Sequence, residues 1–73
     1  MQNQFTAIIE REKDRYVAHC AEIDVASQGK TVEEAVKNLK EALELFFESA
    51  SPAEIRERSH EEVRVTRMKV ALG

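Results

Sequence analysis

Residues 31–48 read TVEEAVKNLKEALELFFE, and their apolar positions recur with the 3.6-residue period of an α-helix. Thr31 followed by Glu34 forms a capping box, in which a hydroxyl and a carboxylate satisfy free amide groups at the helix start. Glu33 and Glu34 also complement the positive end of the helix dipole. We therefore predict a helix over residues 31–48, about 27 Å long. Its apolar stripe consists of Val32, Ala35, Val36, Leu39, Ala42, Leu43 and Phe46.

The sequence before this helix alternates between apolar and polar residues. Two alternating runs, residues 4–12 and 15–23, flank a short charged turn at Lys13-Asp14-Arg15. This pattern is typical of an antiparallel hairpin, which we place over residues 4–23. A short third strand is expected over residues 25–28, followed by Gly29, which we expect to supply a turn or a positive φ.

After the helix, Ser51 and Glu54 repeat the capping pattern, with Pro52 at the first helical position. A short helical turn is expected over residues 52–58. Residues 62–72 are rich in β-branched side chains and alternate, which predicts a C-terminal strand. The order β-β-β-α-β defines one α+β domain over residues 1–73, a mainly antiparallel sheet with the long helix packed on one face. The other face is left to solvent, a second copy or a partner.

The chain is small, with 73 residues and a net charge of −3. Below roughly 70–80 residues a single core seldom suffices without a staple or self-association. The lone Cys20 cannot form an internal disulfide, so we expect a homo-oligomer, a dimer or a tetramer. With neither a secretory signal nor an apolar run of about 20 residues, the sequence predicts a cytoplasmic protein that does not enter membranes.

No residue pattern in the sequence indicates a catalyst, a metal site or a cofactor. His19 and Cys20 are neighbours in a strand, so their side chains are expected on opposite faces and cannot act as a nucleophile and its base. A divalent-metal nuclease would need converging carboxylates. The candidates are Glu10, Asp14, Glu22 and Asp24. We interpret them as solvated strand ends and turns, and we expect no enzyme.

Residues 16–48 resemble the HicB family of type II antitoxins. The resemblance lies in an acidic segment after a strand, Glu22-Ile23-Asp24, followed by a Ser27-Gln28-Gly29 turn. A helix with the pattern T-x-E-E-A-x-x-N-x-x-E-A follows. Its positions here are Thr31, Glu33, Glu34, Ala35, Asn38, Glu41 and Ala42.

This resemblance implies a partial ribonuclease H-like fold and binding of a HicA-type toxin, a small basic ribonuclease that such domains neutralise. The alternative is a stand-alone oligomeric interaction or regulatory domain without a toxin. Many members carry a C-terminal DNA-binding domain, which this sequence leaves no room for, so we expect no direct DNA binding. The expected partner-binding residues are Glu22, Asp24 and Gln28 near the hairpin, and Glu41 and Glu44 on the helix.

Overall fold

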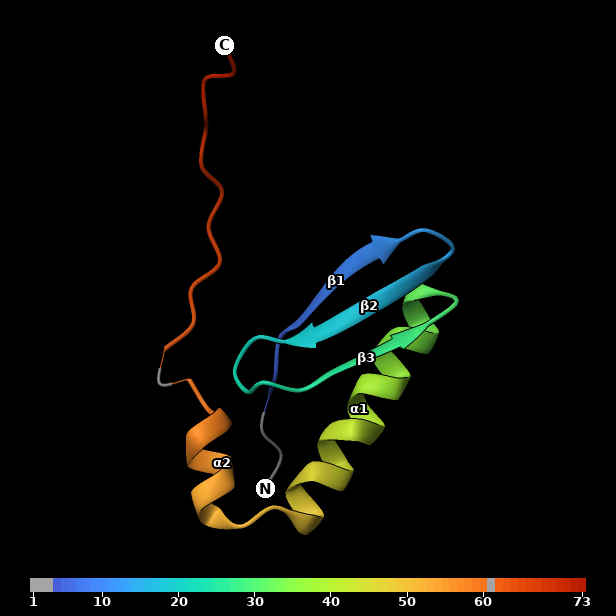
Figure 1. The fold of residues 1–73 in the computed structure, drawn as a ribbon, viewed down its shortest axis with the longest axis vertical. Helices are drawn as coiled ribbons and strands as arrows, with labels where there is room; N and C mark the ends of the chain where they lie inside the picture. The colour runs from blue at the N-terminus through green and yellow to red at the C-terminus, as the bar shows by residue number, and fades with distance from the viewer. Residues whose placement is uncertain (1–3, 61) are drawn as a thin grey trace.

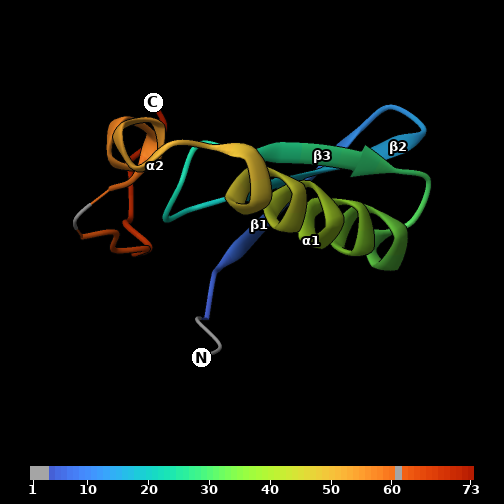
Figure 2. The same ribbon diagram turned by 90° about the horizontal axis from the view of Figure 1, so that it is seen from below.

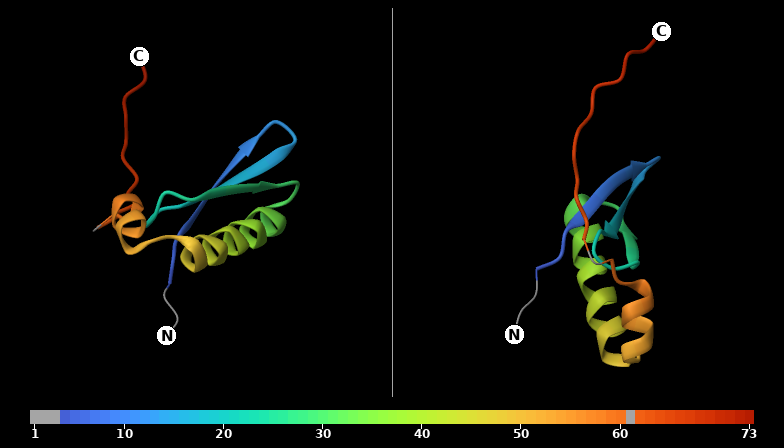
Figure 3. Two further views of the ribbon diagram at one scale, coloured as in Figure 1. Left: turned by 60° about the horizontal axis from the view of Figure 1, so that its bottom comes forward. Right: turned by 90° about the vertical axis from the view of Figure 1, so that its left-hand side faces the viewer.

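The computed structural model describes residues 4–60 and 62–73 (Figure 1). Strands β1 (Ala7–Glu12), β2 (Arg15–Cys20) and β3 (Ala26–Gly29) precede helices α1 (Val32–Ser49) and α2 (Pro52–Arg58). The strands form one antiparallel sheet in the order β1-β2-β3. α1 lies along one face of this sheet, as Figures 2 and 3 show. The predicted α+β arrangement, with three antiparallel strands followed by a long helix, is confirmed.

The hairpin forms where the alternation predicted it, although its strands are shorter than the predicted range of 4–23. Glu12 pairs with Arg15, so the connection is the two-residue turn Lys13-Asp14. Lys13 adopts φ 57°, a left-handed conformation that allows the chain to reverse within two residues. Strand β3 covers residues 26–29, one position later than the predicted 25–28.

The capping signals of both helices work as the sequence indicates. The Thr31 hydroxyl accepts a hydrogen bond of 3.0 Å from the Glu34 amide, and the Ser51 hydroxyl accepts one of 3.2 Å from the Glu54 amide. The Glu34 carboxylate accepts from the Lys30 amide at 3.3 Å, one residue earlier than a standard capping box requires. The predicted ranges of 31–48 and 52–58 therefore agree with α1 and α2 to within one residue.

The core lies between the sheet and α1, and it is small. Even-numbered residues of β2 and every fourth residue of α1 meet there, because a strand alternates its faces and a helix returns to the same face after about four residues. The buried hydrophobic residues are Ala18, Cys20, Ile23, Ala35, Leu39 and Leu43. Three of these six residues are alanine or cysteine, which have small side chains. Little apolar surface is therefore buried on folding, and the hydrophobic contribution to stability is small.

Gly29 lets the end of β3 approach the start of α1. A Cβ atom at this position would lie 2.6 Å from the Ala35 amide nitrogen and 2.8 Å from the Glu34 carbonyl carbon. These are backbone atoms, which cannot move away as a flexible side chain could. Among the described residues, the only glycine with a positive φ is Gly73. The prediction that Gly29 supplies a turn or a positive φ is therefore wrong. The glycine is needed because the end of β3 packs closely against the backbone of α1.

The predicted C-terminal strand over residues 62–72 does not form in this structure. Residues 62–73 pair with no strand among the described residues and are exposed throughout, and Figure 1 shows them leading away from the sheet. The physical reason is that a strand is stabilised by a partner backbone, whatever its side-chain pattern. Residue 61 lies outside the described residues. We refer below to residues 62–73 as the C-terminal tail.

Candidate functional site

The loop between β2 and β3 is held by the chain that follows α2. The Asp24 amide donates to the Arg58 carbonyl at 3.0 Å, and the His60 amide donates to the Glu22 carbonyl at 2.9 Å. Between these two bonds, Ile23 and Ser59 form an isolated antiparallel bridge. We call residues 22–24 and 58–60 together the loop clasp. Because Ile23 is only 1% exposed, the clasp also anchors its loop in the core.

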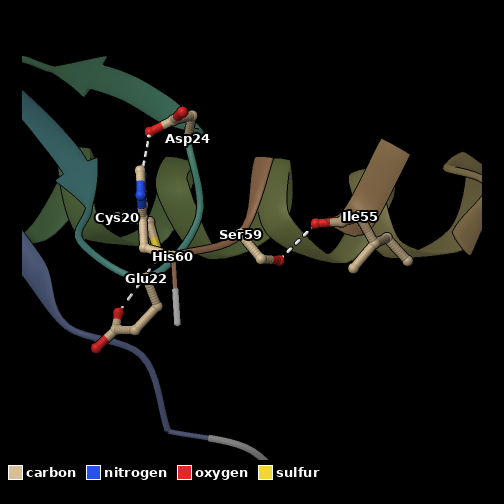
Figure 4. Close-up of polar contacts among 6 residues, drawn as sticks. All are labelled: Cys20, Glu22, Asp24, Ile55, Ser59 and His60. Carbon is tan, nitrogen blue, oxygen red and sulfur yellow. Dashed lines mark hydrogen bonds and ion pairs between the residues drawn. The ribbon is translucent and has the colours of Figure 1, made fainter. Parts of the chain in front are cut away.

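Within the loop clasp, the Glu22 carboxylate is occupied by contacts inside the chain. It accepts hydrogen bonds of 2.7 Å from both the amide and the hydroxyl of Thr6, and one of 3.6 Å from the Cys20 thiol (Figure 4 shows the thiol contact). The Thr6 hydroxyl, followed by the Thr6 amide, lowers the pKa of Glu22 below its ordinary value of 4.5. Glu22 is therefore ionised at neutral pH and ties the start of the hairpin to the loop clasp.

Asp24 is also engaged within the chain. Its Oδ1 atom lies 2.8 Å from Nε2 of His60, and Figure 4 shows this contact crossing from the loop to the segment after α2. Both side chains are substantially exposed, so the pair is solvated and adds little stability. A partner that binds Asp24 would therefore compete with a weak internal contact rather than a buried one.

Apart from the Cys20–Glu22 and Asp24–His60 contacts, the candidate catalytic side chains named from the sequence do not come together. Cys20 is buried on the helix side of the sheet, whereas the alternation of β2 directs His19 to the other face. Asp14 lies in the hairpin turn, a full strand length of about 20 Å from the end of β1 where Glu22 binds Thr6. Among the described residues, no three His, Cys, Asp or Glu side chains are grouped so as to hold a metal ion.

The five predicted partner-binding residues do not form one surface. Glu22 and Asp24 lie in the loop clasp at one end of the sheet. Gln28 pairs with Val17, so its side chain lies on the sheet face away from α1, and its carbonyl accepts a 2.8 Å bond from the Asn38 amide group. Glu41 and Glu44 are exposed on α1.

The exposed side of α1 is acidic and carries no internal ion pair. It presents Glu33, Glu34, Glu41, Glu44 and Glu48 against Lys37 and Lys40. In the described part of the chain, ion pairs form only between Asp24 and His60 and between Glu62 and Arg64. The helix carboxylates therefore lack ion-pair partners of their own, and a basic partner would meet them without breaking one.

In the described part of the chain, no helix or strand lies over the sheet face opposite α1, as Figures 2 and 3 show. It combines apolar and polar side chains, with Ile8 39% exposed and His19 exposed beside it on β2. A shallow hollow lined by His19, Cys20, Asp24, Val25 and Ala26 lies where β2 ends and β3 begins. This mixed surface suits contact with a macromolecule better than enclosure of a small ligand.

Within the described residues, no helix has the length and apolar character needed to cross a membrane. Comparison of the chain with protein-family models, curated proteins and solved structures found no match.

Sequence reasoning missed the residues that build the loop clasp. Thr6, Ser59 and His60 are distant in sequence from residues 22–24, and no local pattern pairs them. Asn38 was noted only as a motif position, and its bond to the Gln28 carbonyl gives it a structural role. The only available signal was the polar residue type of these positions, because most polar side chains in proteins form hydrogen bonds with backbone groups or water.

Proposed function

We propose that this chain is an antitoxin-like binding domain that neutralises a small basic ribonuclease of the HicA type in the cytoplasm. The proposal rests on the motif over residues 16–48. The observation that carries it is the exposed acidic side of α1, whose carboxylates are free of ion pairs among the described residues. Such a surface attracts a basic partner over distances of about one Debye length and orients it before contact.

The structural roles found for Glu22 and Asp24 move the expected contact away from the loop clasp. Their carboxylates bind Thr6 and His60, whereas Glu41 and Glu44 bind nothing within the described chain. In the proposed complex, Glu41 and Glu44 therefore carry the electrostatic part of toxin recognition. Occlusion of the toxin requires no catalytic group from this chain.

The test is toxin rescue in cells. The neighbouring gene, if it encodes a small basic protein, is expressed in cells with and without this chain, and cell growth is measured. We expect growth arrest by the neighbour alone and rescue by co-expression. The double variant Glu41→Lys with Glu44→Lys should weaken binding at least tenfold in low salt. The matched control is Glu54→Lys with Glu57→Lys on α2, which changes the net charge equally and should retain binding.

Either of two results would contradict this function: no toxic neighbour exists, or the α1 and α2 double variants bind equally. The second candidate is a stand-alone oligomeric interaction domain without a toxin partner. The uncovered sheet face and its exposed Ile8 favour this candidate. Rescue by the wild-type chain would exclude it.

A further inference from the structure

The C-terminal tail has the side-chain pattern of a strand but pairs with no strand among the described residues. Its even-numbered residues Met68, Val70 and Leu72 are 83%, 64% and 93% exposed. Its odd-numbered residues include Arg67 and Lys69, which an extended chain places on the opposite face. Over residues 67–72 the tail is thus apolar on one face and carries two basic residues on the other, which is the pattern of a strand at the edge of a half-buried sheet.

The sheet has one covered edge and one open edge. At β3, the outward carbonyl of Gln28 is occupied by Asn38, and Gly29 packs against α1. At β1, the Ala21 amide bonds to the Thr6 carbonyl, so the alternating antiparallel ladder directs the backbone groups of Ala7, Ile9 and Arg11 away from β2. Within the described residues, the β1 edge therefore offers donors and acceptors without a partner to another strand.

An uncovered apolar strip of α1 lies on the β1 side of the sheet. Phe47 contacts Phe5, just before β1, with ring centroids 5.7 Å apart. Val36 precedes Phe47 by about three helical turns and so shares its side, whereas Asn38 bonds to β3 on the other side. Phe5, Val36 and Phe47 are each 38–40% exposed. A strand added at β1 would cover this strip if its inner face were apolar.

We propose that residues 65–72 of one chain add as an antiparallel strand to the β1 edge of a second copy, and that the second copy returns the same contact. One register pairs the apolar residues of the tail with those of the β1 edge on the helix side. It places Leu72 opposite Phe5, Val70 opposite Ala7 and Met68 opposite Ile9 on the helix side. On the outer side, the same register places Arg67 opposite Glu10. Cross-strand apolar and opposite-charge pairs of this kind stabilise antiparallel sheets.

The second copy fits better than the tail's own chain. The His60 amide binds the Glu22 carbonyl, and the Glu22 carboxylate binds Thr6, which precedes β1. The tail therefore starts near the first residue of its own β1. Folding back would therefore force it to run parallel to β1. Arg64 and Thr66 would then face the apolar strip near Phe5, while Leu72 would pass the end of the strand. Only the antiparallel orientation brings the apolar residues of the tail against the apolar strip beside β1.

This interface does not depend on a toxin, so its failure and failure of the proposed antitoxin function are distinguishable. The first experiment is sedimentation equilibrium of the full chain from 1 to 200 µM. We expect a reversible dimer. Val70→Asp should weaken dimerisation at least tenfold and leave the fold intact, because the tail pairs with no described element of its own chain. Val63→Asp in the same tail lies beyond the paired register and is the matched control.

A second experiment identifies which chain the tail joins. In a Cys20→Ala background, Glu10→Cys and Arg67→Cys are combined and oxidised. A disulfide-linked dimer on a non-reducing gel supports the exchange between copies. A disulfide within one chain would overturn it and show that the tail folds back. A monomer at 200 µM, or a Val70→Asp variant that dimerises like Val63→Asp, would also overturn it.

Discussion

At the scale of single residues, Glu22 shows how one residue joins three parts of the chain through its carboxylate and its backbone carbonyl. It accepts from the amide and the hydroxyl of Thr6 before β1, while its own carbonyl accepts from His60 after α2. Both Thr6 donors favour the charged form of the carboxylate, which is why the pKa of Glu22 is lowered. The hairpin start and the loop clasp therefore share one ionisable group.

The hydrogen bonds between Thr6 and the Glu22 carboxylate predict that part of the free energy of unfolding is lost at acidic pH. Because the pKa of Glu22 is lower in the folded than in the unfolded chain, its ionised form stabilises the fold above pH 4.5. That contribution is lost as the pH falls through the folded-state pKa. Glu22→Gln should therefore lower the free energy of unfolding at pH 7 and reduce its change between pH 7 and pH 3. Urea denaturation at each pH measures both effects.

The matched control for Glu22 is Glu44→Gln, which removes an exposed helix carboxylate without a hydrogen-bond partner among the described residues. Glu44→Gln should lower the free energy of unfolding at pH 7 by less than Glu22→Gln does. An equal pH dependence in Glu22→Gln and wild type would contradict the role of Glu22 in the loop clasp.

At the scale of elements, the contact between β3 and α1 depends on the absence of a side chain at position 29. A methyl group there would lie under 3.0 Å from the backbone of Glu34 and Ala35, so the helix start would have to shift. Gly29→Ala should cost about 1–3 kcal/mol, the usual cost of overpacking. Thermal unfolding followed by circular dichroism measures this loss.

Ser27→Ala is a suitable comparison for Gly29→Ala, since Ser27 lies two residues earlier in the same strand and its side chain faces the same side. It should change stability by much less. If Gly29→Ala were neutral, the close approach of the two elements would not limit the choice of residue, and the glycine at the end of β3 would need another explanation.

At the scale of the whole molecule, the core offers few large side chains to hold the fold. Leu39 is 3% exposed and lies at the centre of the α1 stripe, between the buried Ala35 and Leu43. Leu39→Ala should cost about 2–5 kcal/mol. Since native domains are stable by only about 5–15 kcal/mol, this variant should be partly or fully unfolded at 37 °C. Urea denaturation monitored by circular dichroism measures it.

Leu45 on the same helix provides the comparison, because its side chain is 65% exposed. Leu45→Ala removes the same atoms but should change stability by less than about 0.5 kcal/mol, as exposed substitutions usually do. Similar losses for the two variants would mean that Leu45 is buried in solution, which would point to a further interface on the outer side of α1.

Local patterns in the sequence were sufficient for the elements that depend on local interactions. The helix stripe, the two capping serine and threonine residues and the alternating hairpin act within a few residues of one another, so α1, α2, β1 and β2 were predictable to within a few residues. The partner-binding residues were less predictable. Nothing near Glu22 or Asp24 in sequence shows that Thr6 and His60 occupy their carboxylates.

The sequence by itself determined which segments are helical or extended and which face of each is apolar, because those properties arise from spacing along the chain. The tertiary structure alone decided three things: the loop clasp, the reason for Gly29, and the unpaired state of the C-terminal tail. Each depends on backbone groups that are far apart in sequence. An alternating pattern indicates that a segment can form a strand. Whether it does so depends on the positions of the other strands, because a strand needs a partner backbone within hydrogen-bonding distance.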